Sequence, residues 1–194
     1  FIHATNNSWN FTIYDPWVNA LRTTTGTMAA VLAGVDSFTV KPYDHAVEKP
    51  TAFAERIARN QQLVLKEESY LDRIADPAAG SYYIENLTQL LMDEAWQLFL
   101  KIDDEGGFIQ ALEKGMIQQQ LKESATRRNN NIASRREILL GTNQFPNFNE
   151  NLSEEISAAA MQADDKSDPA ATIETIKVYR GAMEFERLRY LTDR

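Results

Sequence analysis

Residues 1–44 read FIHATNNSWNFTIYDPWVNALRTTTGTMAAVLAGVDSFTVKPYD, and this stretch decides the fold class. Residues 1–4 and 37–40 are short apolar segments of the length and composition typical of buried strands. A segment long enough for a helix separates them, and a polar loop follows each expected strand. The order strand, helix, strand predicts a parallel βαβ unit and therefore an α/β fold.

The segment between the two expected strands carries the signals of a helix over residues 17–33. Asp15 is suited to cap the first turn, and Pro16 is suited to the first helical position. Gly34 is typical of the position just beyond a helix C-terminus. A second helix is expected from Thr51, so the strand–helix rhythm repeats once. Two such units belong either to a small open sheet or to the last part of a larger barrel.

The middle of the chain is expected to be helical. Apolar residues recur at helical spacing on one face of an amphipathic helix, and they are Leu87, Leu91, Ala95, Leu98 and Ile102. Gly106 and Gly107 are expected to end this helix, and further helix should follow to about residue 134. Residues 137–141 are apolar and predict a final strand.

The chain divides into three parts by composition and pattern. Residues 1–145 form the main folded region, and residues 146–171 form a linker with a short helix at about 153–161. Residues 172–194 form a helical tail that leads to a following region. Because the expected first strand is already under way at Phe1, we expect the chain to be cut from a longer protein.

Composition excludes several classes of function. The net charge of −8 argues against nucleic-acid binding, which requires a basic surface. The absence of cysteine excludes disulfides, thiolate metal sites and a cysteine nucleophile. No segment has the apolar length of a membrane span and no signal peptide is visible, so we expect a protein of the cytoplasm or an organelle matrix.

The residues with chemistry are few and leave alternatives open. His3 and His45, the only histidines, follow expected strands, where α/β folds place functional groups, but each also suits a polar loop. Without a carboxylate cluster they do not predict a metal site. Several charged pairs could bind an anion or share a proton, although a solvated helix face, or a structural ion pair in the case of Arg56 with Arg59, explains them as well. These pairs are Glu67 with Glu68, Arg56 with Arg59, Arg127 with Arg128, and Arg135 with Arg136.

Joined motifs resemble the methylmalonyl-CoA mutase family of acyl-CoA mutases. The family pattern is H-x-x-x-x-x-W-x-x-T-x-x-D-P-x-x-N-x-x-R-T. The matching residues are His3, Trp9, Thr12, Asp15, Pro16, Asn19, Arg22 and Thr23. Five further segments match in order, and they are residues 56–63, 67–69, 76–88, 106–108 and 138–143. The resemblance covers residues 1–145, with looser matches in the tail.

The resemblance implies the C-terminal portion of a (β/α)₈ TIM-type barrel with a helical tail. Family members isomerise methylmalonyl-CoA and succinyl-CoA with adenosylcobalamin, and the barrel holds the acyl-CoA. A separate domain carries the D-x-H-x-x-G loop whose histidine binds cobalt, and this chain has no such loop.

The chain departs from the catalytic members at the positions that face the cofactor. The pattern of catalytic members at the second strand is similar to S-L-H-T-N-x-x-D-E. In this chain Lys41 stands at the position of the Asn, and His45 stands at the position of the Glu. In the first motif, Thr5 replaces a Gln that faces the corrin, and Ser8 replaces a Gly. These changes remove groups that orient a nucleoside, and a cofactor enzyme must position the reactive atom.

The pattern T-V-x-P-Y-D at residues 39–44 resembles the small, non-catalytic subunit of two-chain mutases. The resemblance then implies a heterodimer with a large catalytic subunit, in a complex that uses acyl-CoA and adenosylcobalamin. The chain would be part of an isomerase without catalytic residues of its own, and would not bind the cofactor or a metal. The vestigial site would be lined by His3, Thr5, Lys41, Tyr43 and His45.

Two alternatives stay open. The chain could belong to an active mutase barrel with altered substrate specificity, in which His3, Lys41 and His45 contact substrate or cofactor. It could also be a fragment without activity of its own, which is compatible with either parent.

Overall fold

The computed structural model describes residues 1–47, 50–150, 173–176 and 178–192. The chain contains two compact units. The first comprises Phe1–Pro77, Ile132–Asp164 and Tyr179–Arg194, and the second comprises Ala78–Asn131 and Asp165–Val178. Within the described residues, no helix has both the length and the hydropathy needed to cross a membrane.

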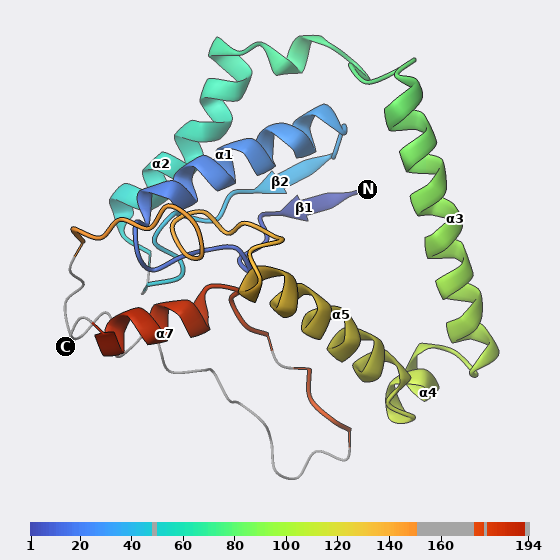
Figure 1. Cartoon of the computed structure of the whole chain (residues 1–194). Coiled ribbons are helices and arrows are strands. Elements are labelled where there is room, and N and C mark those ends of the chain that lie inside the picture. Colours follow the sequence, from blue (N-terminus) through green and yellow to red (C-terminus); the bar gives the residue numbers. More distant parts are fainter. Residues whose placement is uncertain (48–49, 151–172, 177, 193–194) are drawn as a thin grey trace. The chain divides into compact units, whose positions relative to one another are not determined.

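The first unit contains the expected βαβ arrangement. Strands β1 (His3–Thr5) and β2 (Ser37–Thr39) pair in parallel, with Ala4 opposite Phe38. Helix α1 (Trp17–Leu32) connects them and runs alongside both strands (Figure 1). The α/β class is therefore confirmed. Among the described residues these two strands form the one sheet. The other strands of a barrel are not part of these residues.

Helix α2 (Ala52–Leu63) follows β2 and packs against α1. The Oγ1 of Thr51 accepts a hydrogen bond from the Ala54 amide, as expected of a helix cap. The helix continues through a π-helical turn, η1 (Val64–Glu68), and a short 3₁₀ turn, η2 (Leu71–Arg73).

The core of the first unit lies around the loop between β1 and α1 rather than on the short strands. This loop contains three consecutive residues that are almost completely inaccessible to solvent, namely Phe11, Thr12 and Ile13. The other buried apolar residues of the unit are Tyr14, Val40, Tyr43, Ala54, Ala58, Leu65, Ile132, Leu139 and Ala182. The loop is therefore a structural centre of the unit.

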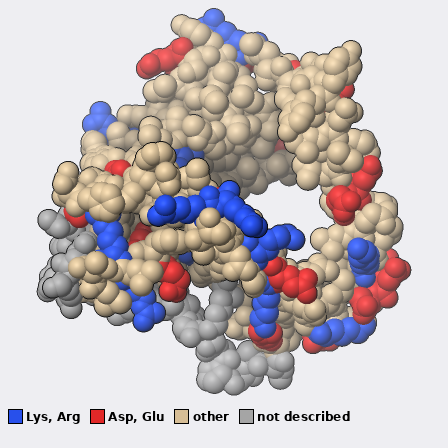
Figure 2. Space-filling model, in the orientation of Figure 1, with Lys and Arg blue, Asp and Glu red and all other residues tan. Residues whose placement is uncertain are grey.

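The second unit is helical. It contains α3 (Tyr82–Asp104), α4 (Phe108–Glu113) and most of α5 (Met116–Ala133). Gly106 and Gly107 separate α3 from α4 with φ angles of 98° and 96°, a conformation that favours glycine. The expected helix and its end are confirmed. No residue of α3 is buried, and the upper part of this helix carries few charged side chains (Figures 1 and 2).

Two local predictions are wrong. Residues 137–141 form no strand, because Gly141 adopts a left-handed conformation with φ of 77° and its amide bonds back to the Gln144 carbonyl. Asp15 does not cap α1: no side chain caps this helix in the described part of the chain. The backbone of Asp15 is itself left-handed, with φ of 50°, and its main-chain carbonyl accepts from the Val18 amide instead.

The tail contains helix α7 (Met183–Thr192), which begins later than the sequence predicts. Residues 173–176 and 178–182 are not helical. The expected linker helix at 153–161, and residues 151–171 in general, lie outside the described residues.

Candidate functional site

His3 and Thr5 lie two residues apart on β1 and come together with hydroxyls from β2. The His3 Nδ1 is 2.7 Å from the Ser37 Oγ, and its Nε2 is 3.3 Å from the Thr39 Oγ1. The Thr5 hydroxyl donates to the Thr39 carbonyl at 3.1 Å. Residues two apart on a strand share a face. At these positions that face of the sheet therefore carries polar groups. The interior of an ordinary TIM barrel is packed with bulky branched residues instead.

Lys41 ties together the loops that follow the two strands. Its main-chain amide donates to the Asn6 Oδ1 at 3.2 Å, and its ammonium donates to the Ser8 Oγ at 3.3 Å. Both contacts reach the loop after β1. The cation predicted at this position is therefore held by groups of the chain itself.

His45 lies against the buried loop. Its ring meets the Phe11 ring edge-on, with centroids 6.4 Å apart. Burial and the charge of Lys41 lower the pKa of His45, and the charge of Asp44 raises it to a smaller extent. Asp44 itself accepts from the Thr51 amide and hydroxyl at 2.9 and 2.8 Å. Its role is thus to hold the start of α2.

Tyr43 belongs to the packing of the unit. Its ring stacks on Trp17 with centroids 4.7 Å apart and an interplanar angle of 29°. Burial, with a smaller contribution from Asp44, raises the pKa of the Tyr43 hydroxyl. The Tyr43 carbonyl accepts from the Asn19 side chain at 2.9 Å, so both its ring and its backbone belong to the packing around α1.

A buried polar cluster on α1 organises the same loops. The Asn19 side chain accepts from the Thr12 amide at 3.0 Å and donates to the carbonyls of Thr12 and Tyr43 at 2.8 and 2.9 Å. The Arg22 guanidinium donates to the Asn19 Oδ1 at 2.8 Å and to the Leu140 carbonyl at 2.6 Å. Burial lowers the pKa of Arg22, against the opposing charges of Asp15 and Glu186. The spacing of three residues, which places Asn19 and Arg22 on one helix face, was the available sequence signal.

A second buried cluster joins the tail to the loop after β1. The Glu186 carboxylate accepts from the Ile13 amide and from the Arg180 guanidinium, each at 2.8 Å. Burial raises the pKa of Glu186. Arg180 and the hydrogen bond from Ile13 lower this pKa, but by less, so it stays above its ordinary value. Sequence reasoning missed this cluster because 173 residues separate Ile13 from Glu186.

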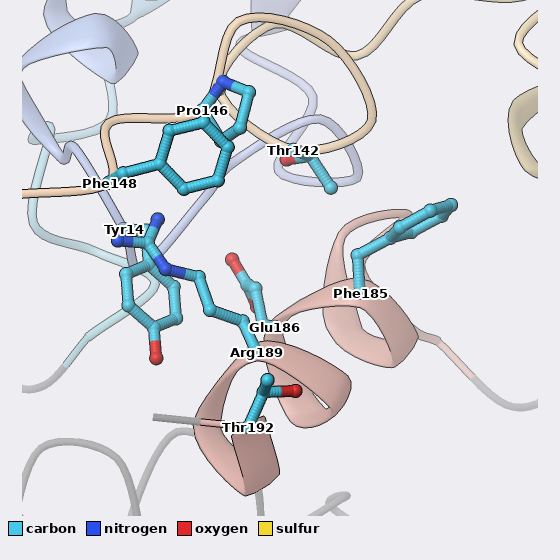
Figure 3. A pocket seen from close by; sticks show the side chains of 9 residues that line it. Tyr14, Thr142, Pro146, Phe148, Phe185, Glu186, Arg189 and Thr192 are labelled. Atoms are coloured by element: carbon cyan, nitrogen blue, oxygen red, sulfur yellow. The ribbon is translucent and has the colours of Figure 1, made fainter. Parts of the chain in front are cut away.

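A cavity of about 350 Å³ lies between α7, the 141–148 segment and Tyr14 (Figure 3). The Arg189 guanidinium lies over the Tyr14 ring, 4.0 Å from its centroid, and donates to the carbonyls of Asn147 and Glu150. The cavity is lined by Tyr14, Gly141, Thr142, Pro146, Phe148, Phe185, Glu186, Arg189 and Thr192. None of the five predicted site residues lines this cavity.

The described residues contain no group of three or more His, Cys, Asp or Glu side chains that could hold a metal ion. The candidate residues lie in two places. His3 is the first residue of β1 and contacts hydroxyls of β2, whereas Lys41 and His45 lie in the loop after β2. Only the second place matches that of functional groups in α/β proteins, at the carboxyl end of a strand.

The fold defines an α/β protein with two parallel strands, in which Lys41 and His45 follow the carboxyl end of β2. Residues 1–191 match the family model described as methylmalonyl-CoA mutase, and the chain belongs to this family.

Two similar relatives are small subunits. The methylmalonyl-CoA mutase small subunit of Porphyromonas gingivalis is 50% identical over 99% of this chain and 31% of its own length. That of Streptomyces virginiae is 42% identical over 74% of this chain and 23% of its own length. The methylmalonyl-CoA mutase of Escherichia coli is 34% identical over 92% of this chain and 25% of its own length. The chain thus spans less than a third of the length of these relatives.

Proposed function

We propose that the chain is the C-terminal barrel portion of the small subunit of an adenosylcobalamin-dependent methylmalonyl-CoA mutase. It carries out no chemistry itself and supports a large catalytic subunit in a heterodimer. One observation carries the proposal. Lys41 and His45 stand at the positions where the pattern of catalytic members has Asn and Glu.

The contacts of Lys41 and His45 support this assignment. The ammonium of Lys41 is bound to Ser8, and the ring of His45 lies against Phe11. Neither residue offers the carboxylate or the amide that a nucleoside would use at these positions. The residues present do not fit an adenosyl group, so we assign no step through cobalamin to this chain. The cofactor and the acyl-CoA belong to the complex as a whole.

The degree of similarity supports the small subunit over the single-chain enzyme. The chain is 50% identical to a protein named as a small subunit and 34% identical to two proteins named simply as mutases. The parallel pair of β1 and β2 with α1 and α2 is compatible with the last βα units of a barrel. A cytoplasmic location follows from the same proposal.

One observation favours an active barrel as the second candidate. The face of the sheet that carries His3 and Thr5 has hydroxyls where a purely structural barrel would have branched apolar residues. A polar lumen suits an acyl-CoA ligand. In that case His3, Lys41 and His45 would contact substrate or cofactor.

Substitution in the intact complex distinguishes the two candidates. With His45→Ala and, separately, Lys41→Ala, turnover should stay within about threefold of the wild type, because neither residue reaches a reacting atom. A matched control is Thr25→Ala on the exposed side of α1. A loss of about a hundredfold, roughly 2.7 kcal/mol of transition-state stabilisation, with either variant but not with the control would establish the active barrel.

A further inference from the structure

The start of the tail follows the loop after β1 with main-chain contacts at every second residue. The Gly181 amide donates to the Trp9 carbonyl at 2.7 Å, and the Arg180 Nη1 donates to the Phe11 carbonyl at 3.2 Å. The Glu186 carboxylate accepts from the Ile13 amide at 2.8 Å. Because these contacts use the backbone of the loop, they fix its path rather than one side chain.

The contacts are shielded from solvent. Glu186 is 3% exposed, Phe11 is 1% exposed and Ile13 is fully buried. The Arg180 Nη1 lies 2.8 Å from the Glu186 Oε2, so the buried carboxylate has a paired charge. Removal of one partner of such a pair leaves a buried charge uncompensated, which is strongly unfavourable.

The closest approach occurs at Gly181. A Cβ atom at this position would lie 2.5 Å from the Trp9 indole, closer than atoms in contact can lie. Only glycine allows the tail to pass the indole at this distance. The tail and the loop are therefore fitted to each other along the three contacts.

The other side of the loop meets the site. Ser8 accepts the hydrogen bond of the Lys41 ammonium, and Phe11 packs against the His45 ring. Each of these residues is adjacent to, or the same as, a residue that the tail holds. The tail therefore reaches His45 through one loop residue, Phe11, and Lys41 through two, Trp9 and Ser8.

We propose that residues 180–186, named here the C-terminal anchor, position the loop after β1 and thereby the surroundings of Lys41 and His45. Arg180 and Glu186 are positioning residues, since they act through Phe11 and Ile13. The inference concerns the geometry of the site, and it holds whether the chain is a small subunit or an active barrel.

Other charged groups lie near the two ends of this arrangement. Arg180 and Arg22 lower the pKa of Glu186, whereas Lys41 lowers and Asp44 raises that of His45. We expect a change at Glu186 to reach His45 through the loop and its Phe11 ring.

The test is an NMR titration of the histidine ring signals in the full-length protein, with wild type, Glu186→Ala and Glu184→Ala compared. Glu184 is exposed on the same helix and serves as the matched control. With Glu186→Ala, release of Phe11 should move the pKa of His45 up towards that of an ordinary histidine. His45 should not respond to Glu184→Ala. An unchanged His45 in a folded Glu186→Ala protein would overturn the proposal.

Hydrogen exchange covers the case in which Glu186→Ala fails to fold. Glu186→Gln keeps the shape of the side chain but loses the charge that pairs with Arg180. Exchange of the Ile13 amide should become about tenfold faster or more, because a charge-assisted hydrogen bond is weakened. Exchange of amides in the middle of α1 should keep its wild-type rate. Equal rates at Ile13 in wild type and Glu186→Gln would overturn the proposal without bearing on the small-subunit assignment.

Discussion

The side-chain amide of Asn19 donates to the main-chain carbonyl of Tyr43 at 2.9 Å from a position with no solvent exposure. The same amide donates to the Thr12 carbonyl at 2.8 Å. One side chain on α1 therefore holds the loop after β1 and the loop after β2 together. Ser8, Lys41 and His45, at which the chain departs from the family pattern, lie on these two loops, so we expect Asn19 to hold the framework of the proposed vestigial site.

Asn19→Ala should destabilise the protein by about 3 kcal/mol, because it leaves the Thr12 amide and two buried carbonyls without partners. The measurement is chemical denaturation followed by circular dichroism. Thr25→Ala, on the exposed side of the same helix, should change the free energy of unfolding by less than about 0.5 kcal/mol. Similar values for the two variants would show that the buried cluster does not hold the loops.

Glu186 should make a contribution to stability that falls as the pH rises. Its pKa in the folded protein is raised above the ordinary value of 4.5, so the folded state binds the proton more tightly than the unfolded state. The contribution is fully present below pH 4.5 and is lost as the pH rises through the folded pKa. The check is the free energy of unfolding of wild type minus that of Glu186→Gln across this window. A difference that grows with pH would mean that pairing with Arg180 outweighs burial.

Helix α3 should drive self-association when the chain of 194 residues is studied alone. Trp96 and Phe99 stack with centroids 5.2 Å apart while they stay 57% and 53% exposed. Exposed apolar patches of this kind favour association. Sedimentation velocity should show oligomers, and the double variant Trp96→Gln, Phe99→Gln should reduce them. Glu94→Gln on the same helix is the control. A strictly monomeric wild-type chain at high concentration would contradict this prediction.

The elements with local signals could be predicted from the sequence. Residues 1–44 predict β1, α1 and β2 because apolar segments, a proline and a glycine mark strands and helix ends. The helical spacing of the apolar residues predicts α3 in the same way. The failed strand at 137–141 has a local cause of another kind. The Asn143 side chain accepts from the Leu139 amide and donates to the Glu137 carbonyl, which turns the chain back on itself.

The site could be predicted only in part. The family pattern identified His3, Lys41 and His45, and the structure places His3 at the start of β1 and the other two after β2. It did not identify the contacts of Arg180 and Glu186, because a buried ion pair in the tail has no periodic signal and its partners lie at the other end of the chain. Burial, which decides whether a carboxylate is structural, is a property of the folded chain.

The central claim is that this chain supports a catalytic partner and does not hold the cofactor. It is tested most directly by native mass spectrometry of the full-length protein purified from its own cells, with bound cobalamin scored on each chain. The account predicts a complex of two different large chains, with cobalamin on the partner alone. A homo-oligomer with cobalamin on this chain would contradict it, and would assign Lys41 and His45 to a working active site.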